Sequence, residues 1–288
     1  MRIDLHTHSA MSDGTASPAE LAAQARAADL DVVALTDHDT TAGWAEAADA
    51  AVQHGVALVR GIEVSARHRG HGVHLLAYLP DPTHPALAAM LERIVAGRSS
   101  RAPAMVAALN RAGVAITLDD VGERAVTGRP HVADALVRLG VVASRDEAFE
   151  QWLDVGRPGY VDRYAAPVVE AIGVVADAGG VTVVAHPWAR GRRDALPPSE
   201  LAVLAAAGLT GVEVDHREHE RPDVRDELRA LARDLDLVVT GSSDHHGTGK
   251  VDHDLGCHTT DPEQYERLLA AAAAASAASG RATPAVVG

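Results

Sequence analysis

An alternation of short β-branched runs with longer alanine-rich stretches of helical periodicity constrains the fold most strongly. The pattern predicts seven strands, at residues 3–6, 32–36, 57–64, 73–79, 181–186, 211–215 and 237–241. Amphipathic periodicity predicts helices at 18–28, 42–54, 198–207, 222–234 and 262–278, and proline at or near the start of several of them is a helix-entry signal. Strands separated by helices form right-handed βαβ units and a parallel sheet. Seven strands are one fewer than a TIM barrel has, so we predict an α/β fold with a distorted (β/α) barrel.

The stretch from residue 82 to residue 166 interrupts this alternation. Its pattern predicts helices at 85–111, 118–125, 131–138 and 144–154, with one short strand at 114–117. We therefore predict a discontinuous catalytic barrel of residues 1–81 and 167–288, and an inserted helical cap domain of residues 82–166. The last residues, 280–288, are expected to be frayed.

Charge and composition exclude several classes of partner. The formal net charge of −14 disfavours a wide electrostatic contact with nucleic acid, so no stable long nucleic-acid partner is expected. No window reaches the roughly 18 apolar residues of a membrane span, and no apolar stretch of about 7–15 residues follows Met1 and Arg2. We therefore expect neither a signal peptide nor association with a membrane. Cys257 is the only cysteine, which fits a cytoplasmic location. Sixteen histidines beside a single lysine, Lys250, need an explanation.

Histidines and carboxylates recur where the predicted strands end. In IDLHTHSAMSDG, His6 and His8 are two residues apart, so their side chains point to the same face of a strand. The strand ends of a parallel barrel emerge on one face, so we expect nine potential metal ligands to lie at one rim of the barrel. They are His6, His8, Asp13, His38, Glu63, His74, His186, Asp244 and His246. A single histidine at a strand end is more often an ordinary polar residue. Glu63 and His74, however, interrupt apolar strands, where an unpaired polar group costs roughly 1–3 kcal/mol.

Six motifs in fixed order resemble those of the PHP (polymerase and histidinol phosphatase) family over essentially the whole chain: HTHSAMSDG, LTDHDT, GIEVS, VHLLAY, AHP and SSDHHG. The segments TGRPHVADAL and GVEVDH resemble a subgroup of metal-dependent phosphoesterases that act on small nucleotides. The resemblance implies a distorted seven-stranded barrel with a trinuclear metal centre. It assigns His6, His8, Glu63 and Asp244 to one metal, and Glu63, His74 and His186 to the second. It assigns Asp13, His38 and His246 to the third. His245 replaces the family's usual aromatic residue, so His245 and His246 are alternatives, of which we favour His246.

The ligand chemistry and the resemblance together predict three divalent metal ions per chain. Mixed imidazole and carboxylate ligands suit manganese, iron or zinc, and we favour manganese. A water shared by two such ions becomes a hydroxide nucleophile near neutral pH, and a third ion can hold phosphoryl oxygens. We therefore predict a metal-dependent phosphoric ester hydrolase in which Glu63 and Asp244 are central to catalysis.

Further residues are candidates for binding or proton transfer. Arg129 and His131 stand at a predicted helix start in TGRPH, where a guanidinium and the helix N-terminus both favour phosphate. Arg157, in VGRPGYV, is a second candidate for substrate binding. His216 either donates a proton to the leaving group or only lines the rim.

The leading functional hypothesis is hydrolysis of a small nucleotide, such as a nucleoside 3′,5′-bisphosphate or a cyclic phosphate. A 5′-to-3′ exoribonuclease acting on short RNA and a histidinol-phosphate-type phosphatase are alternatives with the same metal site. A non-catalytic binding domain would be favoured by missing ligands, and all nine are present.

Overall fold

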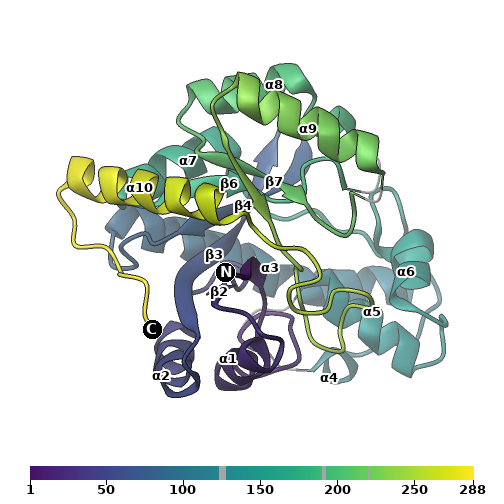
Figure 1. The fold of residues 1–288 in the computed structure, drawn as a ribbon. Coiled ribbons are helices and arrows are strands. Elements are labelled where there is room, and N and C mark those ends of the chain that lie inside the picture. Colours follow the sequence, from purple (N-terminus) through teal and green to yellow (C-terminus); the bar gives the residue numbers. More distant parts are fainter. Residues whose placement is uncertain (123–127, 190–192, 220) are drawn as a thin grey trace. The chain divides into compact units, whose positions relative to one another are not determined.

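The computed structural model describes residues 1–122, 128–189, 193–219 and 221–288 (Figure 1). It divides into two compact units. We call Met1–Leu91 with Ala166–Gly288 the barrel unit, and Glu92–Ala165 the helical unit. No helix within the described ranges is long and apolar enough to cross a membrane.

The barrel unit is built on a nearly closed sheet of seven main strands, which confirms the predicted fold class. Their order is β1 (Ile3–Thr7), β2 (Val32–Leu35), β3 (Ala57–His68), β4 (His71–Tyr78), β6 (Val181–Val184), β7 (Gly211–Asp215) and β8 (Val238–Gly241). The two-residue strand β5 (Ala166–Pro167) pairs with β3. Most strand residues are buried on both faces, as expected for a sheet covered by helices.

Strand β4 corrects the expectation of an all-parallel sheet. It runs antiparallel to both of its neighbours, β3 and β6. The reason is local: β3 and β4 are joined through Arg69 and Gly70, whose φ angles of 47° and 88° suit a tight hairpin. A parallel pair of strands would need a longer crossover connection, usually a helix, and no helix lies between β3 and β4.

Helices cover the strands of the barrel unit. They are α1 (Pro18–Ala27), α2 (Trp44–His54), α7 (Val168–Asp177), α8 (Pro198–Ala206), α9 (Pro222–Asp234) and α10 (Pro262–Ser279). Ser17 and Glu20 form a capping box that starts α1. Helix α7 was not among the predicted helices; it packs against β6 and beside α10, which is yellow in Figure 1.

The helical unit contains the part of α3 (Pro85–Arg111) that follows Leu91, together with α4 (Leu118–Val121), α5 (Arg129–Arg138) and α6 (Arg145–Ala148). A π-helical turn, Phe149–Leu153, continues α6. Residues 114–117 are not a strand: Val114 and Ile116 instead pack into the apolar core of this unit. The predicted helix 118–125 stops at Val121, and its residues 123–125 lie outside the described ranges.

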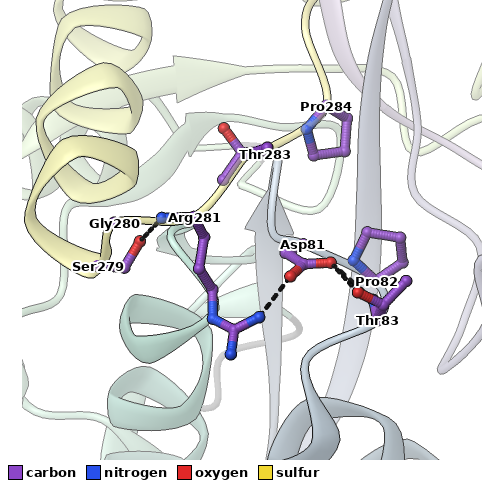
Figure 2. A pocket seen from close by; sticks show the side chains of 9 residues that line it. Asp81, Pro82, Thr83, Ser279, Gly280, Arg281, Thr283 and Pro284 are labelled. Carbon is purple, nitrogen blue, oxygen red and sulfur yellow. Dashed lines mark hydrogen bonds and ion pairs between the residues drawn. The ribbon is translucent and has the colours of Figure 1, made fainter.

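The C-terminal segment is ordered, contrary to expectation. Val287 pairs with Leu58 at the start of β3, and Arg281 forms an ion pair with Asp81 at 2.6 Å. Figure 2 shows the groove between this segment and the loop after β4. The groove contains none of the nine predicted metal ligands.

Candidate metal centre

Glu63 lies at the centre of the nine predicted ligands, which we call the Glu63 cluster. Each of its two carboxylate oxygens faces histidine ring nitrogens at 2.7–3.4 Å, and five histidines take part: His6, His8, His38, His74 and His186. β3 places Glu63 here, and β4 places His74 beside it through the antiparallel register. A carboxylate with imidazoles on both oxygens has the arrangement of a bridging ligand.

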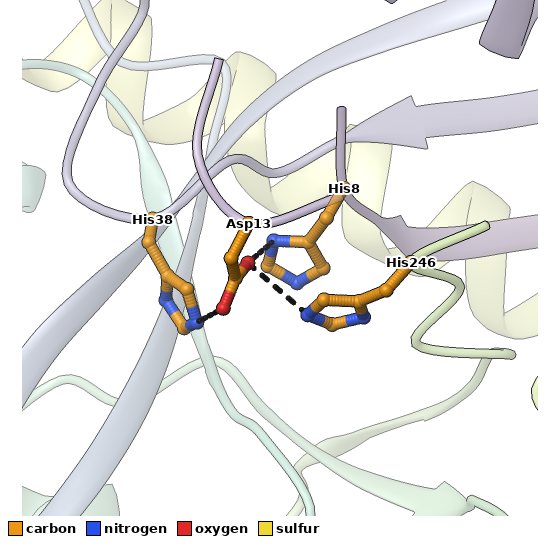
Figure 3. Close-up of side chains that lie close together, drawn as sticks. All are labelled: His8, Asp13, His38 and His246. Carbon is orange, nitrogen blue, oxygen red and sulfur yellow. Dashed lines mark ion pairs between the residues drawn. The ribbon is translucent and has the colours of Figure 1, made fainter. Parts of the chain in front are cut away.

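A second group of side chains surrounds Asp13 (Figure 3). Its Oδ1 lies 3.2 Å from His246 Nε2, and its Oδ2 lies 3.7 Å from His38 Nε2. His8 completes the group, with its ring stacked on that of His246 at 4.1 Å between centroids. The neighbouring His245 instead uses Nδ1 to contact the His253 carbonyl oxygen at 2.7 Å.

Asp244 has two different sides. Its Oδ1 lies 3.5 Å from His6 Nε2 and 3.4 Å from His8 Nε2. Its Oδ2 accepts from His216 Nε2, at 3.2 Å, and from the ammonium of Lys250. The backbone N–H of Glu218 donates to His216 Nδ1, so the proton of a neutral His216 is on Nε2, where Asp244 accepts it.

The donor set fits metal cations. His6 Nδ1 faces the buried carboxylate of Glu213 at 3.1 Å, so this nitrogen is the donor. The lone pair of a neutral His6 is then on Nε2, which faces Glu63, Asp244 and the Nε2 of His8. Acceptors that face acceptors at about this distance are held together by a proton or by a metal cation between them. Orientation of a ligand histidine by a carboxylate is also common in metal sites.

Electrostatics in the cluster favour charged forms. Burial alone would raise the pKa of Glu63, but the charges of His38 and His74 hold it well below 4.5. Burial likewise opposes ionisation of Asp244, and Lys250 and His6 keep its pKa well below 3.8. Three acids therefore remain carboxylates at neutral pH, since the pKa of Asp13 is also lowered, by His38 and His246, against the effect of burial.

Strained backbone accompanies the cluster. Asp39, His186 and Asp244 have φ angles of 56°, 29° and 52°, in the left-handed region that non-glycine residues rarely adopt. Each such residue costs roughly 1–3 kcal/mol, and such strain is concentrated at functional sites.

Three residues that contribute to this region were not identified from the sequence. Glu213 is buried inside the apolar run of β7, the same signal that singled out Glu63. Lys250 contacts Asp244 and is the only lysine in the sequence, so its rarity was the available signal. His253 is 6% exposed, and its Nδ1 contacts the Ser243 carbonyl oxygen.

Asp37 and Asp39, which flank His38 in the sequence, have serine partners. Asp37 accepts from Ser9 and Ser12 and so fixes the loop that carries Asp13. Asp39 accepts from the backbone and side chain of Ser65.

The predicted substrate-binding residues lie in the helical unit. Arg129 opens α5, with Nη1 3.5 Å from Asp154 Oδ1 and its guanidinium 5.2 Å from the Phe149 ring centroid. His131 is buried, and its Nδ1 accepts from the Gly128 backbone N–H at 2.9 Å. Arg157 is in an exposed loop. Thr127, in the same motif as Arg129, lies outside the described residues.

Comparison with known proteins identifies the family. Residues 4–117 match the model of the PHP domain. A 3′,5′-nucleoside bisphosphate phosphatase of Chromobacterium violaceum is 38% identical over 263 residues, which cover 90% of this chain and 92% of the relative. A 5′-3′ exoribonuclease of Haemophilus influenzae is 34% identical over 249 residues, which cover 85% of this chain and 90% of that relative.

A solved structure from Bifidobacterium adolescentis, described as a metal-dependent phosphoesterase, is 40% identical with a TM-score of 0.88. The match covers 93% of this chain and 96% of that chain. The resemblance noted from the motifs is thus confirmed over nearly the whole length. The chain belongs to the PHP family of metal-dependent phosphoesterases.

Proposed function

We propose that the protein hydrolyses a phosphate ester of a small nucleotide, with a nucleoside 3′,5′-bisphosphate as the leading substrate. The observation that carries the proposal is the arrangement of five histidines around the carboxylate of Glu63. The choice of substrate class is supported by 38% identity to a relative named for that activity.

We propose that the nine residues of the Glu63 cluster hold three divalent cations, with manganese favoured over iron and zinc. Glu63 would be shared between two of them. When bound, such ions would lower the pKa of water and stabilise negative charge on phosphoryl oxygens.

The protein's own groups have separate tasks in this proposal. Glu213 orients His6, and His216 with Lys250 orients Asp244, so that the lone pairs of the cluster converge. Arg129 and His131 bind a substrate phosphate, and Arg157 is a further candidate. We also propose that residues 82–166 act as a cap domain in substrate selection.

An exoribonuclease acting from the 5′ end is the second candidate, because the Haemophilus influenzae relative bears that name. The net charge of −14 disfavours it, since a long RNA needs a track of clustered Lys and Arg. The test compares kcat/KM for a nucleoside 3′,5′-bisphosphate with kcat/KM for a 5′-phosphorylated oligoribonucleotide. We expect the bisphosphate to be preferred and its kcat/KM to depend weakly on salt. A tenfold preference for the oligonucleotide would replace the first proposal with the second.

A further inference from the structure

His219 is a buried histidine in the loop after β7 and is not one of the nine predicted metal ligands. It is 1% exposed, and both of its ring nitrogens contact the backbone. Nδ1 lies 2.9 Å from the carbonyl oxygen of Val214, on β7, and Nε2 lies 3.3 Å from the backbone nitrogen of Trp188. A carbonyl oxygen accepts and a backbone N–H donates. The neutral ring therefore carries its proton on Nδ1 and accepts from Trp188 at Nε2.

Burial keeps the His219 ring neutral. Burial lowers the pKa of His219 from 6.5 to about 4, against the effect of the hydrogen bond to Val214. At neutral pH the ring is thus a link with one end on β7 and the other on the N–H of Trp188. Because an unpaired buried N–H is costly, loss of this acceptor would favour another conformation of the backbone at Trp188.

Trp188 is two residues from His186, in the turn that follows β6. His186 has a φ angle of 29°, which non-glycine residues rarely adopt, so the turn needs outside support. Glu213 accepts from the backbone N–H of His186 at 2.9 Å. His219 supplies a second contact, at Trp188. Both supports come from β7 and the loop that follows it, and together they hold the turn at two points.

This turn sets the direction of a single side chain of the Glu63 cluster. His186 Nε2 faces Glu63 Oε1 at 3.4 Å. The other members of the cluster are carried by β1, β3 and β4 and by the loops after β1, β2 and β8. A displaced backbone at Trp188 therefore acts on His186 before it acts on any other ligand.

We infer that His219 is a positioning residue, which acts through the N–H of Trp188 to hold His186 in the conformation that binds metal. The inference rests on the metal assignment of the proposed function, in which Glu63, His74 and His186 share one cation. Loss of the link should weaken the binding of that cation selectively.

Two substitutions separate the two ends of the link. The amide oxygen of His219→Gln can take the place of Nε2, whereas the shorter amide of His219→Asn reaches only the place of Nδ1. His219→Gln should therefore keep the acceptor for Trp188, and His219→Asn should lose it. The control is His54→Asn, at the exposed end of α2.

The test titrates Mn²⁺ alone into the metal-free full-length chain and measures the free ion by electron paramagnetic resonance. We expect His219→Asn to raise the Kd of one of three ions by about 10–100-fold, as for loss of other residues that orient a metal ligand. His219→Gln and the control should bind three ions with the Kd values of the wild-type chain. Wild-type Kd values in His219→Asn would overturn the inference. So would weakened binding of all three ions in both His219 variants, since His219 would then support the whole barrel.

A measurement on the unaltered chain does not depend on the folding of the variants. If the contact at Trp188 strengthens metal binding, metal binding must strengthen that contact by the same factor. Hydrogen exchange at the N–H of Trp188, followed by mass spectrometry, should be about 10–100-fold slower with Mn²⁺ than in chelator. Equal exchange in the two states would refute the link even if neither variant folded.

Neither measurement needs turnover. A wild-type chain that binds three ions but does not hydrolyse a nucleoside 3′,5′-bisphosphate would refute the proposed activity and leave the role of His219 intact. Failure of the proposed function and failure of this inference therefore give different results.

Discussion

His216 Nε2 donates to Oδ2 of Asp244 at 3.2 Å, while the other oxygen of Asp244 faces His6 and His8. The Glu218 backbone N–H fixes the ring by donating to His216 Nδ1. His216 therefore positions a carboxylate of the Glu63 cluster. In this geometry its proton points at Asp244, and a role as proton donor to the leaving group would require that contact to break.

Replacement of His216 tests this positioning role. His216→Ala should lower metal affinity and kcat/KM by about 10–100-fold, the usual cost of losing a residue that orients a metal ligand. Metal content after equilibrium dialysis and kcat/KM should both fall, and His54→Ala at an exposed position is the control. A general acid would show the opposite pattern: full metal content with loss of the basic limb of the pH–rate profile.

Glu63→Gln should remove a shared ligand while keeping the side-chain shape. The neutral amide cannot balance the positive charge of the surrounding site, so we expect fewer metal ions per chain by elemental analysis and strongly reduced turnover. Glu200→Gln, on α8, serves as the matched control because Glu200 pairs with His68 and Arg69, outside the cluster. Full metal retention in Glu63→Gln would argue against a bridging role.

Lys250→Met should destabilise the metal-free protein but strengthen metal binding. Without metal, Asp244 loses its ammonium partner, and the free energy of unfolding should fall by about 1–3 kcal/mol. With metal, loss of a nearby positive charge should tighten binding. Chemical denaturation in chelator and metal titration measure the two effects. Weaker metal binding in this variant would mean that the orienting contact of Lys250 with Asp244 outweighs the repulsion between its ammonium and the metal ions.

The metal-free protein should lose stability as pH rises above neutrality. Burial alone would lower the pKa of His8, but hydrogen bonds with Asp244 and Glu63 raise it from 6.5 to about 9. A raised histidine pKa contributes stability that is complete below 6.5 and is lost as pH rises through about 9.

Metal affinity should increase as pH rises, because metal binding needs neutral histidines and releases their protons. Tm in chelator and the metal Kd, each measured at pH 6.5 and pH 9, test both signs, and the Tm change should shrink in His8→Gln. A Tm that rises with pH in chelator would contradict the assignment.

Arg129→Ala should reduce kcat/KM by a factor that corresponds to about 1–3 kcal/mol, with metal content unchanged, if Arg129 binds a substrate phosphate. Arg138→Ala, at the other end of α5, is the control. Loss of metal in Arg129→Ala, or unchanged kinetics, would exclude this role.

The sequence was sufficient for much of the fold because buried strands and amphipathic helices have different periods. The position of Glu63 inside an apolar strand also indicated its burial, whereas His74, in the same kind of position, has a side chain that is 36% exposed. The direction of β4 could not be predicted, because the alternation of residues along a strand is the same in a parallel and an antiparallel pair. Recognition of the hairpin needed the turn at Arg69 and Gly70, whose positive φ angles are not apparent from the residue types alone.

Partnerships between particular residues were the other gap. Lys250 and Asp244 are close in sequence, but nothing in the residue types fixes the direction of a long flexible side chain. Glu213 could have been identified by the argument used for Glu63. Val287 pairs with Leu58 through backbone groups, for which side-chain patterns give no signal.

The hairpin of β3 and β4 implies an order of assembly during folding. Glu63 and His74 are on consecutive strands joined by a tight turn, so their meeting closes only a short loop. His6 and Asp244 come from opposite ends of the chain, and their meeting must await closure of nearly the whole barrel. Loop-closure entropy grows with length, and hairpins form within about 1–10 μs. The folding chain therefore brings together two of the nine residues of the Glu63 cluster before it brings in those contributed by the two ends of the chain.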